Sequence, residues 1–185
     1  MPGPPRTRVA GYPFGLGVDI GEADFEVLRP VRHKTPAQQE SKPAFREAFQ
    51  RRRCLVPVDN FYEWAKAAAG KQPYAIALAD RSLMALAGLW ENWRSPEGEW
   101  MRSFAIITTT PNELCARLHN RMPVVLKPEA WPVWLGEEPA DQSALKALLP
   151  PFPSDEMICW PVNARVGNVK NNDASLIESI DAVSH

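Results

Sequence analysis

The run from residue 54 to residue 64 constrains the fold more than any other part of this chain. It reads Cys-Leu-Val-Pro-Val-Asp-Asn-Phe-Tyr-Glu-Trp. Apolar and β-branched residues dominate it, so we expect strands over 55–58 and 61–64. Pro57 and the turn formers Asp59 and Asn60 interrupt the run.

Glu63 is the carboxylate of the second strand, and it stands between Tyr62 and Trp64. A carboxylate among aromatic rings loses hydration, which disfavours its charged form and raises its pKa. Such a group can give or take a proton near neutral pH. The alternative is a solvated glutamate on a strand edge, the usual situation of a charged residue.

The chain from residue 42 onward alternates strand-like runs with short helical ones. An amphipathic helix is expected over 42–53, where Ala44, Phe45, Ala48 and Phe49 share one face. Further strands are expected over residues 72–78, 83–93, 104–110, 122–126 and 157–162. A hairpin turn at 95–98 joins two of them. Helices are expected over residues 111–118, 128–135 and 141–149, the first capped by Thr110 and the last by Asp141.

This order of elements predicts an α+β fold with a mostly antiparallel sheet, curled toward a barrel, in a single domain. Residues 1–41 are weakly patterned, with only Phe25 to Leu28 strand-like. We therefore expect a divergent segment over 1–41 and the folded domain over 42–185. The sequence contains no internal repeat, Gly-rich phosphate loop or regular βαβ alternation, so a nucleotide-binding fold is not expected.

The composition is that of a soluble globular protein, with 45% apolar residues, 23% charged residues and a net charge of −1. Cys54, Cys115 and Cys159 form no Cys-x-x-Cys pair, so neither a metal site nor a disulfide framework is expected. The start has no signal-peptide pattern, and no run is long enough to cross a membrane. We expect a cytoplasmic protein. Arg51, Arg52 and Arg53 indicate a local basic groove or, alternatively, a helix end with cations.

Two further clusters carry candidate chemistry. His119 stands between an expected helix and strand, where an imidazole can move protons, and Arg121 is suited to a phosphate. The alternative is that His119 caps the helix and Arg121 pairs with a surface carboxylate. The segment 161–172 holds four asparagines, Arg165 and Lys170. It could hold a sugar-phosphate backbone, or its asparagines could simply form turns.

Together these segments resemble the SRAP (SOS response-associated peptidase) family. The matching stretches are residues 42–64, 104–109 (Phe-Ala-Ile-Ile-Thr-Thr), 118–126 (Leu-His-Asn-Arg-Met-Pro-Val-Val-Leu) and 161–171. The resemblance implies a compact β-rich fold that binds single-stranded DNA in a basic cleft and processes abasic sites. Family members form a thiazolidine crosslink through the cysteine that follows the initiator Met. No cofactor or metal is implied, and we expect a monomer.

By this resemblance Glu63 and His119 are the catalytic candidates. His119 would give a proton to the sugar oxygen during ring opening. Glu63 would position or deprotonate the attacking amine, and would assist removal of the initiator Met. Trp64 matches a stacking position and Arg121 a phosphate or base clamp. In the Asn-rich segment, Asn168 and Lys170 are the candidate backbone contacts.

The start of the chain departs from the family pattern. Pro2 stands where the family has its cysteine, and Cys54 lies in an expected buried strand. Residues 36–41 lack the family's Asn-Ala-Arg segment. Three explanations stay open: a family member that binds DNA without crosslinking, a frameshifted or mis-assigned start, or Pro2 acting as an amine nucleophile in place of cysteine. A truncated, inactive product is a further alternative.

Overall fold

Helix α2 (Pro43–Arg51) is followed directly by strand β3 (Arg53–Val58). The computed structural model describes residues 8–10, 19–21, 43–67, 70–94, 98 and 100–180. The face of α2 that carries Ala48 and Phe49 is buried, as the helical spacing predicted. Arg53 donates to the carbonyl oxygens of Phe49 and Gln50 at the end of α2, which satisfies acceptors that a helix end leaves free. This contact agrees with the helix-end interpretation of the arginine cluster.

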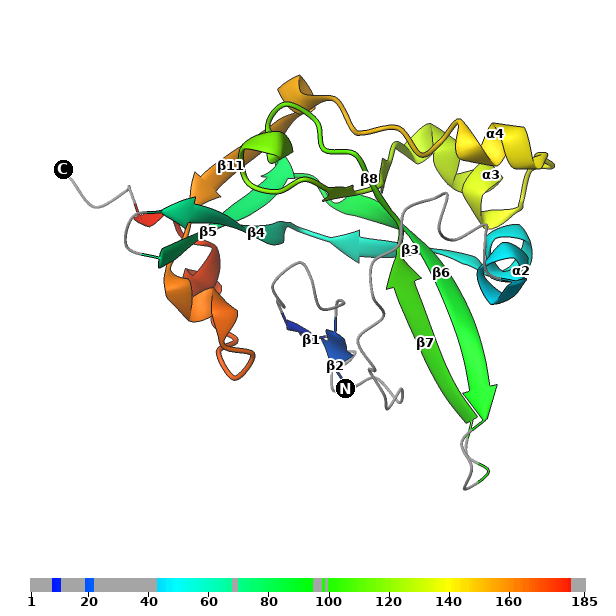
Figure 1. Cartoon of the computed structure of the whole chain (residues 1–185), viewed down its shortest axis with the longest axis horizontal. Coiled ribbons are helices and arrows are strands. Elements are labelled where there is room, and N and C mark those ends of the chain that lie inside the picture. The colour runs from blue at the N-terminus through cyan, green and yellow to red at the C-terminus, as the bar shows by residue number, and fades with distance from the viewer. Residues whose placement is uncertain are drawn as a thin grey trace, which may run out of the picture.

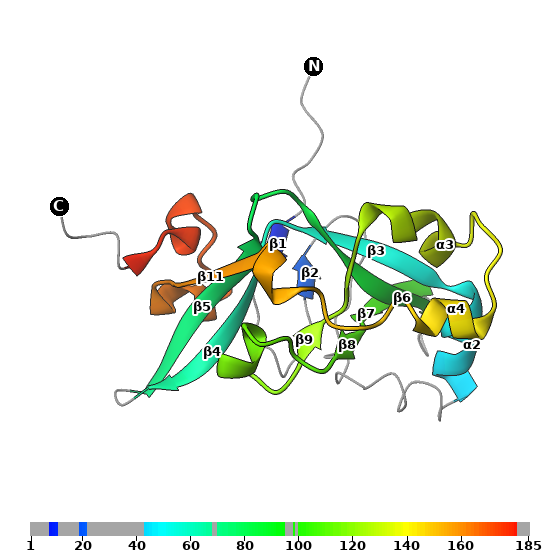
Figure 2. The same ribbon diagram turned by 90° about the horizontal axis from the view of Figure 1, so that it is seen from above.

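The larger sheet is built around β6 (Met84–Arg94). Strand β3 pairs along β6 in antiparallel register, with Val56 opposite Leu86. Strands β7 (Trp100–Ile106) and β10 (Val125–Leu126) also pair with β6. Figures 1 and 2 show α3 and α4 at the end of this sheet where α2 also lies. Here α3 spans Trp131–Leu135 and α4 spans Gln142–Lys146.

The second sheet positions the candidate site. Its order is β11-β5-β4, all antiparallel, formed by β4 (Phe61–Ala67), β5 (Gly70–Leu78) and β11 (Met157–Pro161). Two small ribbons complete the described strands: β1 (Arg8–Ala10) with β2 (Asp19–Gly21), and β8 (Thr108–Thr109) with β9 (Met122–Pro123). The antiparallel α+β prediction is confirmed. Over the described residues the strands form separate sheets and not a closed barrel.

The helices are shorter than the sequence predicted. The expected helix over 111–118 contains only the 3-10 helix η1 (Cys115–Arg117). Buried Asn112 explains this, because its amide donates to Phe152 O and its carbonyl accepts from the Cys115 N–H. The expected cap at Thr110 is therefore wrong. Asp141 does cap α4, by accepting from the Ala144 N–H.

Three expected elements are each divided in two. The strand expected over 104–110 becomes the end of β7 and the short strand β8, which pair with different partners. The strand expected over 122–126 becomes β9 and β10, which pair with different partners, and Val124 between them donates to Ile107 O. The helix expected over 128–135 becomes η2 (Pro128–Ala130) and α3, which ends at Gly136 with φ +83°. The remaining short elements are the 3-10 helices η3 (Ser154–Glu156), η4 (Ala164–Gly167) and η5 (Ala174–Ile177).

One core cluster lies where the two sheets meet. It joins Leu86 and Ile106 of the larger sheet to Phe61 and Ile76 of the second, with Cys115 from η1. A second cluster packs α2, α3 and α4 against the larger sheet. Gly88 is needed for close packing, because a Cβ there would lie 2.8 Å from Cys54 Sγ.

Some predictions fall outside the described residues: the strand over 25–28, most of the turn at 95–98, and the departure from family pattern at 36–41. The division of the chain at residue 41 stays a prediction. Of the helices that the structure describes, none is long and apolar enough to span a membrane.

Candidate functional site

Glu63 is buried in the middle of β4, opposite Tyr74 of β5. It is 1% exposed, and within the described parts of the chain its Oε1 atom has no hydrogen-bond partner. Tyr62 and Trp64 belong to a third cluster with Val162 and Val166, so alternate residues of β4 face opposite sides of the sheet. The solvated strand-edge alternative is therefore wrong for Glu63.

Burial raises the pKa of Glu63 from 4.5 to about 8, and a hydrogen bond from the Trp64 backbone opposes this only in part. The cause is desolvation, since an ionised carboxylate in this position would give up its hydration. At neutral pH the group therefore retains its proton, yet it can release it within the physiological range.

His119 connects this buried carboxyl group to the surface. Its backbone N–H donates to the carbonyl oxygen of Cys115, the first residue of η1, and this bond fixes the position of His119 next to that helix. His119 Nδ1 lies 4.0 Å from Glu63 Oε1 and 3.3 Å from Arg121 O. The imidazole is 36% exposed, whereas the Glu63 side chain is 2% exposed. The pair thus places one titratable group below the surface and one at it.

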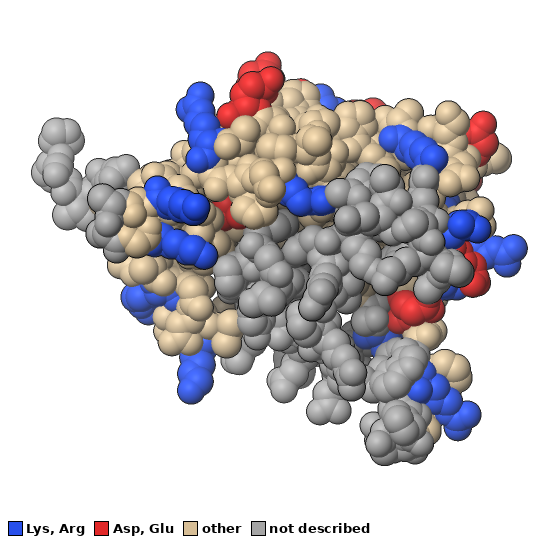
Figure 3. Space-filling view, viewed as in Figure 1, with Lys and Arg blue, Asp and Glu red and all other residues tan. Residues whose placement is uncertain are grey.

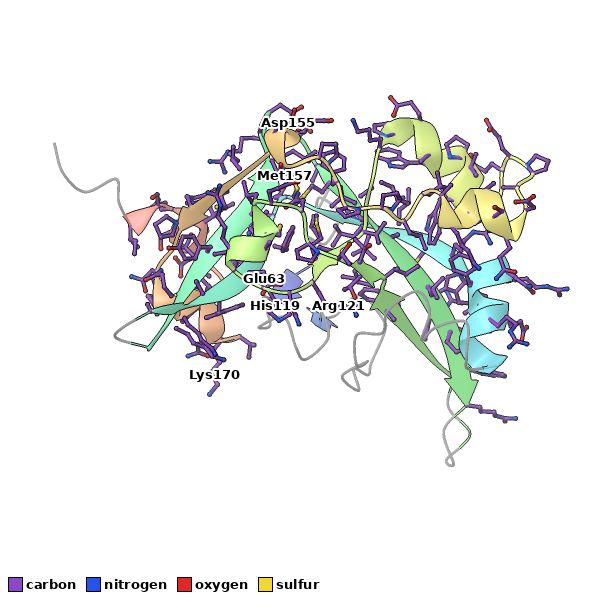
Figure 4. All side chains as sticks on the ribbon, turned by 45° about the horizontal axis from the view of Figure 1, so that its top comes forward. Glu63, His119, Arg121, Asp155, Met157 and Lys170 are labelled. Atoms are coloured by element: carbon purple, nitrogen blue, oxygen red, sulfur yellow. The ribbon has the colours of Figure 1, made fainter. Side chains whose placement is uncertain are left out.

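Arg121 lies on the other side of His119 (Figure 4). Its Nη2 donates to Thr108 O at 2.8 Å and also to the Thr108 hydroxyl. Its Nε is buried and has no partner among the residues the structure describes. Burial lowers the pKa of Arg121, but a guanidinium stays charged at any physiological pH. The alternative that Arg121 pairs with a surface carboxylate is not what these contacts show.

Figure 4 shows Glu63 of β4 close to His119 and Arg121, which both come from the segment between η1 and β9. A buried acid with an unpaired oxygen, an imidazole and a guanidinium with an unpaired N–H therefore share one site. Such a set can hold an anion at the guanidinium and move a proton between the acid and the imidazole.

The Asn-rich segment lies apart from Glu63, His119 and Arg121. Asn163 accepts from the Arg165 N–H and Asn168 from the Lys170 N–H, so these side chains form turns, as one of the two alternatives stated. Lys170 is exposed, and Figure 4 shows it away from His119. Trp64 is half-buried and packs against the cluster that contains Val162. Pro2 lies outside the described residues.

The structure adds residues that the sequence did not reveal. Thr108 is fully buried and holds Arg121, but a threonine in a β-branched run carries no signal of that role. Cys115 is buried near Glu63, and its pKa is raised to about 12 by burial and by the charges of Glu63 and Cys159. Cys54 lies in β3 as expected, and burial raises its pKa to about 11. Over the described residues no cluster of His, Cys, Asp or Glu could hold a metal ion.

Comparisons with known proteins identify relatives of this chain. Residues 31–169 match the family "SOS response associated peptidase (SRAP)". The chain is 42% identical over 139 residues to the abasic site processing protein YoqW of Bacillus subtilis, covering 75% of this chain and 62% of that protein. It is 33% identical over 153 residues to the abasic site processing protein HMCES of Xenopus tropicalis, covering 71% of this chain and 44% of that protein.

A solved structure of a protein from Bacteroides thetaiotaomicron superposes with a TM-score of 0.71 at 29% identity. The superposition covers 77% of this chain and 63% of that one. The chain therefore spans less than two thirds of the length of these relatives. The resemblance drawn from the four sequence stretches is confirmed, and the chain belongs to the SRAP family.

Proposed function

We propose that this chain binds abasic sites in single-stranded DNA as a monomer, and that Glu63 and His119 transfer protons at the exposed deoxyribose. The observation that carries the proposal is the buried Glu63 carboxyl group. Its Oε1 lacks a hydrogen-bond partner among the described residues and lies 4.0 Å from an imidazole that reaches the surface. Titratable groups with strongly shifted pKa values cluster at functional sites. The names of the relatives point to the same substrate.

The first step is opening of the sugar ring. The C1′ hydroxyl loses its proton, the C1′–O4′ bond breaks, and O4′ takes a proton, which leaves an aldehyde at C1′. His119, the exposed partner of the pair, is the donor to O4′ in this proposal. It recovers a proton from solvent or from Glu63.

The second step is attack on the aldehyde by an amine. The amine nitrogen adds to C1′, gives up a proton to the Glu63 carboxylate, and the carbinolamine then loses water. Relatives supply this amine from a cysteine that also adds its thiol. In the printed sequence position 2 is proline. Its secondary amine, freed by removal of Met1, would stop at an iminium.

Arg121 would hold a phosphate next to the lesion. Its Nη2 is fixed by Thr108 while its buried Nε has no partner in the described parts of the chain, so one N–H remains to be satisfied by a ligand. Trp64 would stack on a base, with Asn168 and Lys170 as outer backbone contacts. Figure 3 shows Lys and Arg side chains over the β4–β5 hairpin and the C-terminal 3-10 helices. The basic residues of these segments are Lys66, Lys71, Arg165 and Lys170.

The test is borohydride trapping on a single-stranded oligonucleotide with one abasic site, followed by a denaturing gel. The wild-type chain should give a shifted band, and Glu63→Gln should slow its formation about a hundredfold, the lower end of the range for loss of a general acid–base group. Glu129→Gln, an exposed carboxylate on η2, is the matched control and should behave as the wild type.

Binding measurements separate recognition from chemistry. If no adduct forms but the abasic strand binds more tightly than an undamaged one, the chain recognises the lesion without crosslinking. Equal affinity for both strands, together with no adduct, would contradict the proposal.

A further inference from the structure

The outer half of the β6–β7 hairpin carries a face that the candidate site does not use. The two strands pair over seven positions, from Gly88 opposite Ile106 to Arg94 opposite Trp100. Strand β3 pairs with β6 only as far as Leu89, and among the described strands β7 pairs with β6 alone. Figure 1 shows the resulting two-stranded ribbon projecting from the body of the protein. A two-stranded ribbon is marginally stable without packing on other elements, so its length calls for an explanation.

One face of this ribbon alternates aromatic rings with guanidinium groups. Because cross-strand partners in a sheet share a face, three pairs lie on it in succession: Trp90 with Phe104, Asn92 with Arg102, and Arg94 with Trp100. Successive pairs on one face are about 7 Å apart along the strands. Trp100 is 72% exposed, the largest exposed fraction among the exposed large apolar side chains of the described residues.

The side chains of this face are ordered by contacts with one another. Arg94 lies over the Trp100 ring at 5.9 Å and donates from Nε to Gly98 O. Arg102 lies over the Trp90 ring at 5.3 Å and donates from Nε to Asn92 Oδ1. Cation–π contact of this kind keeps a guanidinium beside an indole. Glu91 is on the opposite face, where it pairs with Arg52.

The same face runs back toward the candidate site. Further along it, Leu86 of β6 and Ile106 of β7 enter the core cluster that also holds Phe61 and Cys115. Phe61 is two residues before Glu63 on β4, and Cys115 is near enough to Glu63 for its charge to act on the thiol. The aromatic and basic face is therefore the outward continuation of the side of the sheet that supports the site.

We propose that this face, which we name the hairpin face (Trp90, Asn92, Arg94, Trp100, Arg102 and Phe104), binds the single-stranded DNA that continues from the abasic site. The inference rests on the proposed function. A base stacks on Trp100, and the guanidinium of Arg94 contacts the neighbouring phosphate. Exposed aromatic rings stack on any base, and arginine supplies the charge, which is the combination that single-strand binding without sequence preference uses. An apolar peptide partner would not need the guanidinium groups at each aromatic step.

The experiment compares two abasic oligonucleotides, one of about six nucleotides and one of about twenty, by fluorescence anisotropy. The variants are Trp100→Ala, Trp100→Phe and Arg94→Ala, with Leu83→Ala as the control, since Leu83 is a 60% exposed apolar residue directly before β6. We expect the long strand to bind the wild type more tightly than the short one. Trp100→Ala should weaken binding of the long strand about thirtyfold, the middle of the range for loss of one stacking contact. It should leave the short strand unchanged.

Trp100→Phe should restore most of the affinity, because a phenyl ring also stacks. Arg94→Ala should make the dependence of log affinity on log salt shallower by about 0.7, the value for one phosphate on a single strand. Thermal unfolding of each variant checks that the fold is retained, as expected for side chains this exposed.

The outcomes separate the two proposals. Unchanged long-strand affinity in Trp100→Ala, with abasic preference intact, would overturn the hairpin face alone and leave a protein partner as its occupant. Trp100-dependent binding of long strands without any preference for the abasic site would sustain the hairpin face and overturn the proposed function. No binding of either strand by the wild type would overturn both.

Discussion

Replacing Glu63 with glutamine should make the protein more stable at neutral pH. Burial raises the pKa of Glu63 from 4.5 to about 8. Below pH 4.5 the carboxyl group is protonated in both the folded and the unfolded chain. Between pH 4.5 and about pH 8 the unfolded chain releases the proton while the folded chain keeps it. Stability from the protonated group is therefore fully present below pH 4.5 and is lost as the pH rises through about 8.

The size of this loss of stability follows from the pH range between the pKa values of Glu63 in the unfolded and the folded chain. Each pH unit costs about 1.36 kcal/mol of folding free energy, so the cost is about 3 kcal/mol at pH 7 and about 5 kcal/mol above pH 8. Glutamine has nearly the same shape and no titration. The stability difference between Glu63→Gln and the wild type should therefore shift by about 3 kcal/mol in favour of the variant between pH 4.5 and pH 7.

The assay is urea unfolding at pH 4.5, 6, 7 and 8. Comparison across pH cancels any constant cost of fitting an amide into the site, and Glu129→Gln controls for the loss of a surface charge. A difference that stays flat with pH, or that favours the wild type more as pH rises, would refute the assignment of Glu63 as a buried, desolvated acid. Active-site groups that lower the stability of the folded protein are common where activity requires them.

Three further predictions concern other parts of the molecule. Arg121→Ala should weaken single-stranded DNA binding about thirtyfold, the middle of the range for an arginine contact, and fluorescence anisotropy showing unchanged affinity would contradict the clamp. Gly88→Ala should destabilise the fold by about 1–3 kcal/mol in urea unfolding, because the new Cβ would lie 2.8 Å from Cys54 Sγ. Gly167→Ala, with nothing within 4 Å, is its control, and equal losses would count against tight packing at Gly88. Cys115, with its buried thiol and a pKa of about 12, should react with a thiol reagent at pH 8 about a hundredfold more slowly in the folded chain than in denaturant. Equal rates in a Cys54→Ser, Cys159→Ser background would contradict that burial.

Strands and their antiparallel pairing were predictable where local pattern and packing agree. The β4 segment is an example, since its apolar, strand-forming run predicted both a strand and a carboxyl group with reduced hydration. The structure confirms the strand and the burial of Glu63, although Tyr62 and Trp64, the neighbours on which the prediction rested, pack in another cluster. The raised pKa of Glu63 followed from the same pattern.

The helix over 111–118 was overestimated because propensity says nothing of distant partners. Asn112 uses its side chain to bond Phe152 O, forty positions away in the sequence, together with Cys115 N. This local bonding holds the segment as a turn and one short 3-10 helix. Whether the sheet closes into a barrel was likewise not predictable, because closure depends on strand ends that the sequence pattern does not locate.

The site residues were found partly by pattern and partly by family resemblance. His119 and Arg121 stood out as polar groups at a helix–strand junction, but only the structure shows that Thr108 orients Arg121. The Asn-rich segment was ambiguous, since turn formation and phosphate binding require the same residue types. Its hydrogen bonds within the loop, such as Asn168 with the Lys170 N–H, show the turn role.

The most direct test of the central claim is the rate of borohydride-trapped adduct formation between pH 6 and pH 9, with the wild type and Glu63→Gln on the same abasic single strand. If the Glu63 carboxylate accepts the proton of the attacking amine, the wild-type rate should rise with pH and level off above about 8, the pKa of Glu63. Glu63→Gln should be slow and lack this inflection. A wild type that forms no adduct at any pH, or a variant with the same rates and the same profile, would contradict the account.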